Sequence, residues 1–293
     1  MNSDRRNKLL LGVLIFLLLC YGSTFGARSS KLRVISLSPH ITEIIFKLGA
    51  GSHLIGRTDF CAYPPAAGQV ESVGGYLNIN FEKIVRLEPD LIMQFPNPEN
   101  RRKLEDLDFE VLDITNETID EILNGIKEIG RALQKVPEAQ NLCENIRDTL
   151  NIASKMNRRQ IFPLPAILVV GRDRGALGNI YLAGSRTYLS ELWELCGGIN
   201  VFNDIDMRYF SVNEEDLLKR DIWVILEFHP GWSSREKIIN MEKKSWSLLN
   251  QLKAVESGDI YIYTDRFYVI PGPRITQVAI SFMKVIQNYN KNQ

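Results

Sequence analysis

The chain has 293 residues, of which 45% are hydrophobic and 24% are charged, a globular composition that excludes a low-complexity chain and leaves room for two medium-sized domains. Lysine and arginine number 35, as do aspartate and glutamate, so no net charge draws the chain to nucleic acid or to an anionic membrane. We therefore expect a locally recognised ligand and no nucleic-acid partner. We also expect a monomeric protein.

The first 26 residues have the three-part order of a secretory signal peptide: MNSDRRNK is positively charged, LLLGVLIFLLLC is apolar, and YGSTFGA is small and polar. The apolar run is shorter than the about 20 residues that cross a bilayer, and the small-residue rule places cleavage after Gly26. Two alternatives stay open, an uncleaved anchor and a lipid on Cys20, although the bulky Leu19 stands where a small residue is expected. The sequence predicts export to the periplasm.

Residues 31–117 alternate short apolar strands with helical patterns, which predicts an N-terminal lobe of the parallel α/β class. Strands are expected at 32–38, 53–58, 89–95 and 109–115, and helices at 41–49, 80–88 and 100–108. The first of these helices is expected to begin at Thr42 and Glu43 and to end at Gly49, as capping rules suggest.

Residues 118–160 form a charged segment with helical periodicity, and we expect one helix to end and another to begin near Pro137. A second α/β lobe is predicted over residues 161–293. Its strands are expected at 165–171, 221–228 and 258–264, and its helices at 187–198, 214–220 and 275–289.

One short motif occurs in both lobes with identical spacing. Its tyrosine, asparagine and glutamate are Tyr76, Asn80 and Glu82 in the first copy and Tyr209, Asn213 and Glu215 in the second. The asparagines are typical helix N-caps, and an acid in the first turn complements the helix dipole. The helix dipole explains the acids, but it does not explain why the spacing between tyrosine and glutamate is the same in both copies. The repeated spacing predicts two related lobes.

Signatures of catalysis are absent from the sequence: it contains no GxSxG, no HExxH and no GxGxxG motif. After removal of the signal, Cys61, Cys143 and Cys196 cannot all pair, and no metal-ligand spacing includes them, so we expect buried small hydrophobes. The alternative of another class is a secreted α/β enzyme that holds a metal ion with His40 and His229.

Basic side chains and aromatic side chains are the candidates for ligand contact. His40 and His229 each directly follow a predicted strand, where open α/β sheets place ligands. Arg172 follows another strand and could meet carboxylates or amide oxygens, although a solvated loop is the alternative. The aromatic candidates lie in loops rich in proline and glycine, with core packing as their alternative; they are Phe60, Tyr63, Tyr76, Tyr209, Phe210, Trp232 and Phe267.

Several segments together resemble one known family. RVISLSPHITEIIFKLGA, GRTDFCAYPP, VGGYLNINFEKIVRLEPDLI, TYLSELWELCGGINVF and IPGPR are similar to the substrate-binding proteins that serve importers of vitamin B12, ferric siderophores and haem. The resemblance implies two Rossmann-like α/β lobes bridged by one long helix, with the ligand between them. It also implies no enzymatic activity and no cofactor of its own, because cobalamin would be the transported ligand.

The vitamin B12-binding members of that family also suggest roles for particular positions. Their aromatic corrin contacts match Phe60, Tyr76 and Tyr209, and the acids that dock on an ABC transporter permease match Glu82 and Glu215. Tyrosines stand here where a well-known member has tryptophans, which leaves the choice of corrinoid open. Haem-binding relatives carry an arginine two places after an axial tyrosine, and this chain has Asn78 there, which disfavours haem. A ferric siderophore or haem stays the alternative ligand.

Overall fold

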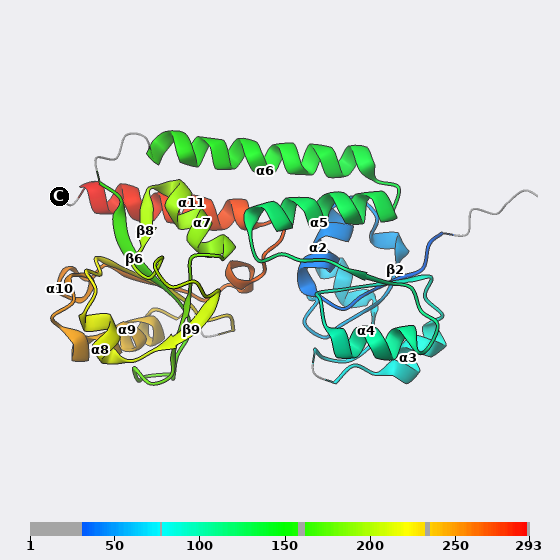
Figure 1. Ribbon diagram of the computed structural model, residues 1–293, viewed down its shortest axis with the longest axis horizontal. Helices are drawn as coiled ribbons and strands as arrows, with labels where there is room; N and C mark the ends of the chain where they lie inside the picture. Colours follow the sequence, from blue (N-terminus) through cyan, green and yellow to red (C-terminus); the bar gives the residue numbers. More distant parts are fainter. Residues whose placement is uncertain (1–30, 77, 158–161, 232–234, 292–293) are drawn as a thin grey trace, which may run out of the picture. The chain divides into compact units, whose positions relative to one another are not determined.

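The computed structural model describes residues 31–76, 78–157, 162–231 and 235–291 (Figure 1). The predicted signal peptide with Cys20, and Trp232, therefore lie outside the described residues. From Arg33 onward the chain forms one compact unit that contains two β-sheets. The lobe boundaries near residues 117 and 160 stay a prediction.

The N-terminal sheet is fully parallel. Its strands are β1 (Val34–Ser36), β2 (Leu54–Arg57), β3 (Glu71–Ser72), β4 (Leu91–Gln94) and β5 (Val111–Asp113), in the order β3-β2-β1-β4-β5. β1 and β4 are buried along their whole length, as expected for strands covered on both faces.

The C-terminal sheet is mixed, whereas the sequence predicted only its parallel part. Its strands are β6 (Leu164–Gly171), β7 (Ile180–Ala183), β8 (Gly198–Asn200), β9 (Tyr209–Val212), β10 (Val224–Phe228) and β11 (Ile260–Tyr263). β7 and β9 run antiparallel to their neighbours in the order β11-β10-β6-β7-β9, and β8 pairs with β6. The connection from β6 to β7 is too short for a parallel crossover, so β7 must return antiparallel.

The α-helices that the sequence predicted are present, and two further α-helices between β10 and β11 were not predicted. The α-helices are α2 (Pro39–Lys47), α3 (Phe81–Leu87), α4 (Pro98–Glu105), α5 (Ile119–Ala132), α6 (Val136–Asn157), α7 (Tyr188–Cys196), α8 (Glu214–Leu218), α9 (Glu236–Ser245), α10 (Lys253–Ser257) and α11 (Ile275–Lys291). The 3₁₀ helices are η1 (Gly51–His53), η2 (Pro65–Gln69), η3 (Trp246–Leu249) and η4 (Arg266–Val269). The predicted break at Pro137 is confirmed, because α6 begins one residue earlier.

The start of α2 differs from the prediction. The helix begins at Pro39, three residues before Thr42, with Ser38 as its N-cap residue. Proline suits the first helical position because its fixed φ is already helical and its missing N–H is not needed there. Thr42 and Glu43 are buried within the helix instead: the Thr42 hydroxyl donates to Ser36 Oγ at 2.8 Å.

The long helices connect the two sheets. α6 packs against α5, which contacts α2 of the N-terminal lobe, and also against α7 and α11 of the C-terminal lobe. In Figure 1, α6 lies alongside both α5 and α11. With 22 residues, α6 is about 33 Å long. It is the long bridging helix that the sequence predicted.

Cys61, Cys143 and Cys196 are all buried free thiols, which confirms their prediction as small hydrophobes. Among the helices of the described segments, none combines the length and apolar character needed to cross a membrane.

Candidate ligand-binding pocket

A pocket of about 680 Å³ lies where the carboxyl ends of strands from both sheets meet. It is lined by Leu37, Ser38, Pro39, Thr58, Phe60, Tyr76, Phe95, Asn116, Glu117, Val170, Tyr188, Leu189, Tyr209, Pro230, Arg266, Val269, Ile270 and Pro271. Open α/β sheets bind ligands at this edge, and sites for small molecules measure about 300 to 1,000 Å³. Position and size therefore both favour a binding site.

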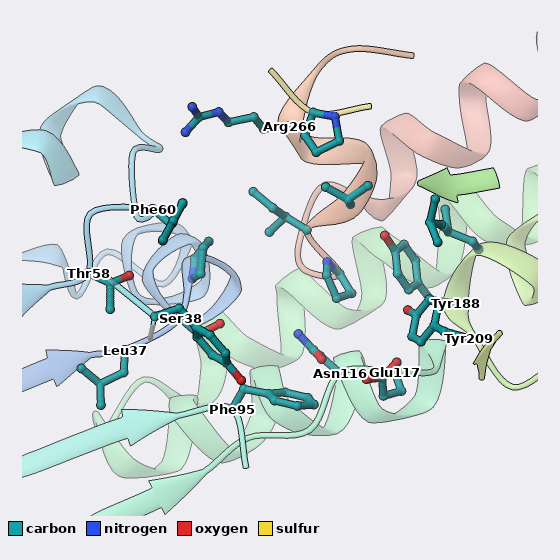
Figure 2. Close-up of a pocket in the computed structure, with 18 residues that line it drawn as sticks. Leu37, Ser38, Thr58, Phe60, Phe95, Asn116, Glu117, Tyr188, Tyr209 and Arg266 are labelled. Atoms are coloured by element: carbon teal, nitrogen blue, oxygen red, sulfur yellow. The ribbon is translucent and has the colours of Figure 1, made fainter. Parts of the chain in front are cut away.

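Aromatic rings form opposite walls of the pocket (Figure 2). Phe60 and Phe95 come from the N-terminal lobe, and Tyr188 and Tyr209 come from the C-terminal lobe. Phe60 is 54% exposed and Tyr76 is 45% exposed, so both rings have apolar surface that a ligand would cover. The structure thus brings together at one pocket three aromatic residues that the sequence singled out, although their contact with a ligand stays a prediction.

Glu117 places a carboxyl group in the pocket wall beside Tyr209 (Figure 2). Burial raises the pKa of Tyr209, and the neighbouring Glu117 carboxylate, which accepts a hydrogen bond from the Tyr209 hydroxyl, adds to that shift. Burial also raises the pKa of Glu117, against the opposing effects of Arg208 and Tyr209. The phenol of Tyr209 therefore keeps its proton at neutral pH.

His40 is buried beneath the pocket and does not line it. Its ring is 2% exposed, Nδ1 lies 2.7 Å from Ser38 Oγ, and burial lowers its pKa to about 3 against a smaller opposing effect of the Ile114 backbone. A Cβ built on Gly272 would lie 3.3 Å from the Cβ of His40, so the glycine of the IPGPR segment permits this close approach. His40 is therefore neutral at physiological pH.

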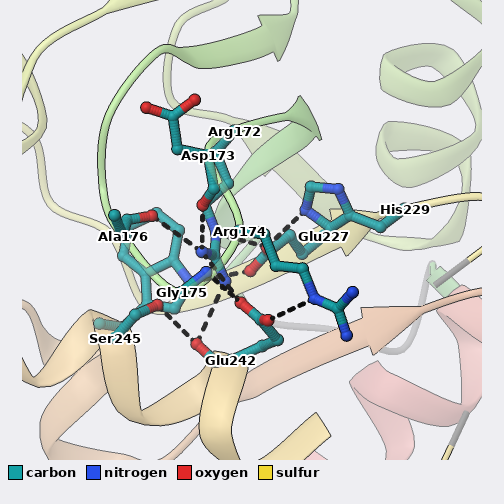
Figure 3. A network of polar contacts seen from close by, with 10 residues as sticks. Arg172, Asp173, Arg174, Gly175, Ala176, Glu227, His229, Glu242 and Ser245 are labelled. Atoms are coloured by element: carbon teal, nitrogen blue, oxygen red, sulfur yellow. Dashed lines mark hydrogen bonds and ion pairs between the residues drawn. The ribbon is translucent and has the colours of Figure 1, made fainter. Parts of the chain in front are cut away.

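Arg172 and His229 belong to a buried polar network (Figure 3). Arg172 Nε and His229 Nε2 each lie 2.6 Å from Glu227 Oε1, and Trp246 Nε1 donates to the other oxygen at 2.8 Å. Burial opposes ionisation of Glu227, but these hydrogen bonds and the Arg172 charge outweigh it and lower its pKa. Neither Arg172 nor His229 lines the pocket.

Glu242 adds a second carboxylate to this network. Its Oε2 accepts a hydrogen bond from the Gly175 N–H at 2.8 Å and lies 3.4 Å from Arg172 Nη1. Its Oε1 lies 3.4 Å from Nε of Arg174, which is 59% exposed. Arg172 is thus surrounded by acceptors of the protein itself, whereas the sequence predicted that it meets a ligand.

Tyr63 and Phe267 line a separate crevice of about 230 Å³ beside the pocket. Their rings lie 4.1 and 5.4 Å from the guanidinium carbon of Arg274. Arg274 in turn donates two hydrogen bonds to Glu43, at 2.8 and 2.5 Å. Because Glu43 lies on α2 and Arg274 directly precedes α11, this pair ties the N-terminal lobe to the C-terminal helix.

Phe210 faces away from the pocket. It is 7% exposed and packs in the core of the C-terminal lobe, where its ring centroid lies 5.7 Å from that of Phe202. Successive side chains of a strand point to opposite faces, so with Tyr209 in the pocket wall, Phe210 must point into the core.

Within the described ranges, no three His, Cys, Asp or Glu side chains are grouped to hold a metal ion.

The repeated motif has the same local structure in both copies. Asn80 accepts a hydrogen bond from the Lys83 N–H at 2.9 Å as the N-cap of α3, and Asn213 accepts one from the Asp216 N–H at 2.9 Å as the N-cap of α8. These predicted caps are confirmed. Four residues before each cap, a tyrosine lines the pocket: Tyr76 in the first copy and Tyr209 in the second. Two residues after each cap, a glutamate is exposed: Glu82 in the first copy and Glu215 in the second.

Sequence reasoning missed several lining residues, although a signal for some was present. Phe95 directly follows the fourth strand of the N-terminal sheet, and Asn116 and Glu117 follow the fifth within a few residues. The strand-end rule that singled out His40 applies equally to them. Tyr188 lies inside a helix, and only the tertiary fold brings it to the pocket.

The geometry is that of a binding protein with a ligand site shared by two α/β lobes. The periplasmic binding protein family model matches residues 34–267, so the chain belongs to this family. The family resemblance and the two-lobed α/β fold predicted from the sequence are thereby confirmed.

Curated and solved relatives agree with this membership. The chain is 29% identical over 268 residues to the vitamin B12-binding protein of Vibrio cholerae serotype O1, covering 87% of this chain and 90% of the relative. The crystal structure of periplasmic vitamin B12-binding protein BtuF of Vibrio cholerae matches with a TM-score of 0.74 and 27% identity, over 88% of this chain and 98% of that one. Periplasmic haem-binding protein HutB of Vibrio cholerae matches with a TM-score of 0.75 over 88% and 99% of the two chains, and its 20% identity supports the fold alone.

Proposed function

We propose that this protein captures cobalamin or a related corrinoid in the pocket between its lobes and delivers it to an ABC-type importer. Residues 1–26 would export it to the periplasm, and ATP hydrolysis would belong to the transporter. The observation that supports this most is the apolar, ring-lined pocket at the strand ends, in a chain that matches vitamin B12-binding relatives over most of its length.

The exposed aromatic rings are one source of affinity. If one ring loses about 100 Å² of apolar surface to a ligand, at about 25 cal/mol per Å² it contributes about 2.5 kcal/mol. Nanomolar affinity requires about 12 kcal/mol after the entropy of association has been lost. Only the well-exposed rings of Phe60 and Tyr76 have that much surface to lose, so together they would contribute about 5 kcal/mol, and the other lining residues and hydrogen bonds to the ligand would supply the rest.

A ferric siderophore or haem remains the second candidate, because Tyr76 and Tyr209 bring phenol oxygens to the pocket. Calorimetric titration of residues 27–293 with cyanocobalamin, haem and a ferric hydroxamate distinguishes the candidates: submicromolar saturation by cyanocobalamin is expected, and saturation by an iron ligand alone would replace the corrinoid proposal.

Glu82 and Glu215 are proposed to dock on the permease. Both are exposed in the first turn of a helix at the same place in the repeated motif, and Glu215 is 77% exposed although it pairs with Lys219. Exposed ion pairs contribute only about 0 to 1 kcal/mol each, so these acids would set orientation on the transporter more than affinity.

A double variant tests this docking. Glu82→Ala with Glu215→Ala should keep cyanocobalamin affinity within about threefold while abolishing corrinoid uptake by cells that depend on this protein. The matched control is Glu99→Ala with Glu214→Ala, because both are first-turn acids and Glu99 forms the same exposed i,i+4 pair with lysine as Glu215 does. Uptake by the control should stay normal, whereas loss of ligand binding in the first double variant would refute the docking role.

A further inference from the structure

The pocket has an uneven distribution of charge. Of the described residues that line it, only Glu117 and Arg266 carry a formal charge at neutral pH, and the others have apolar, aromatic or neutral polar side chains. Figure 2 shows the two charges on different walls, with Glu117 beside Asn116 and Tyr209 and Arg266 well away from them. The wall around Glu117 is therefore the negative side of the pocket.

Several contacts fix Glu117 in place. Its backbone N–H donates to Glu121 Oε2 at 2.7 Å, and its carbonyl accepts a hydrogen bond from the Tyr188 N–H at 2.6 Å. The Tyr209 hydroxyl donates to its carboxylate. A carboxylate offers about four acceptor positions, so this bond leaves others for a ligand.

Few charged groups surround Glu117. Burial raises the pKa of Glu117; Arg208, next to Tyr209 at the start of β9, opposes this, and Glu121 on α5 adds to it. Arg208 is itself engaged with Glu121, with Nη2 3.6 Å from Oε1. Among the described residues no cation forms an ion pair with Glu117, so its carboxylate stays available to a ligand in the pocket.

The chemistry of a negative wall distinguishes two kinds of macrocycle. A corrinoid with carboxamide side chains offers N–H groups that donate to a carboxylate, whereas a macrocycle with carboxylate side chains, such as haem or an unamidated corrin, meets repulsion between like charges. An apolar surrounding strengthens both effects relative to water. Arg266 on the other wall has the opposite preference.

We propose that Glu117, oriented by Tyr209, makes the pocket select amidated corrinoids and reject macrocycles that carry carboxylates. This inference rests on the proposed corrinoid function, and it names the residue that determines specificity within that function. The same side chain would have little effect on the apolar contacts of the ring.

A matched pair of probes tests the charge alone. Dicyanocobinamide carries amides, dicyanocobyrinic acid carries carboxylates at the corresponding positions, and both lack the nucleotide. We expect wild-type protein to prefer the amide probe at pH 7.5 in low salt, measured by calorimetry. Glu117→Gln should narrow this preference by about tenfold, because the acid probe no longer meets a like charge and the amide probe loses a charge-assisted hydrogen bond.

Arg266→Gln is the control of opposite sign, since it removes a positive charge from the same pocket and should widen the preference. Equal preferences in wild type and Glu117→Gln would overturn the inference, even with corrinoid binding intact. Failure of the wild type to bind cyanocobalamin and both probes would instead overturn the proposed function itself. Unchanged thermal unfolding of Glu117→Gln confirms that the comparison concerns folded protein.

Discussion

The structure differs most from the sequence-based expectation at Arg172, which was expected to meet a ligand but lies in a buried polar network. If Arg172 contacts the ligand, Arg172→Ala weakens binding; if it holds the buried network, the substitution destabilises the fold and leaves affinity unchanged. The structure predicts the second result, because the Arg172 side chain is fully buried and lies 2.6 Å from Glu227 and 3.4 Å from Glu242.

The magnitude follows from burial. Removal of one partner of a buried ion pair costs about 3 to 5 kcal/mol, because the remaining charge stays buried without compensation. Glu227 is 0% exposed and Glu242 is 4% exposed, so neither carboxylate can reach water without a change in the fold. For a protein of this size about 1 kcal/mol corresponds to a melting shift of roughly 2 to 4 °C, so Arg172→Ala should melt roughly 10 °C below wild type.

Differential scanning calorimetry measures this shift, and titration with cyanocobalamin at 15 °C measures binding by the folded fraction. Arg174→Ala is the control: this neighbouring arginine is 59% exposed and lies 3.4 Å from Glu242, so its loss should change stability by at most about 1 kcal/mol. Arg172→Lys keeps the charge and should fall between the two. A normal melting temperature for Arg172→Ala, together with weaker ligand binding, would refute the network and restore the ligand role.

Two further predictions concern buried ionisable groups. His40 has a folded pKa of about 3 against 6.5 when unfolded, so only the unfolded chain binds this proton between those values and stability falls with falling pH. In urea unfolding from pH 7 to 5, the free energy of unfolding of His40→Asn should therefore fall by about 1.4 kcal/mol less per pH unit than that of wild type below pH 6.5. Parallel curves for His40→Asn and wild type would contradict the burial of His40. Arg274→Gln should lower the free energy of unfolding by about 3 kcal/mol at pH 7, because Glu43 is 2% exposed and loses its cation. The loss should be smaller at pH 5, because burial raises the pKa of Glu43 so that acid neutralises it. Equal losses at both pH values, or a similar loss in the exposed control Lys47→Gln, would show that the pair does not carry this energy.

Local sequence rules predicted much of the fold. Alternating apolar strands and amphipathic helices, the asparagine caps of α3 and α8, and the restart of the helix near Pro137 all depend on residues close together in the chain. The short strands β3, β7, β8 and β9 escaped prediction, because they lie in the loops of an otherwise regular pattern of strands and helices. The start of α2 was misplaced because Thr42 and Glu43 have the residue types of a cap but are buried in tertiary contacts.

The candidate site shows the same division between local and tertiary information. Strand ends and loop aromatics pointed to Phe60, Tyr76 and Tyr209, which the structure places at one pocket. The pairing of Arg172 with Glu227 depends on the neighbouring positions of β6 and β10, which no local rule provides. A signal was nevertheless present, since Glu227 stands within an apolar strand and a buried charge requires a partner.

If aromatic rings of this pocket hold a corrinoid, loss of one exposed ring must weaken the binding of cyanocobalamin, which calorimetric titration of wild type and Phe60→Ala measures. We expect one site of submicromolar affinity in the wild type and an affinity about 60-fold lower in the variant, the equivalent of about 2.5 kcal/mol for one ring. Equal affinities in the two proteins, or no saturation of the wild type, would contradict this expectation.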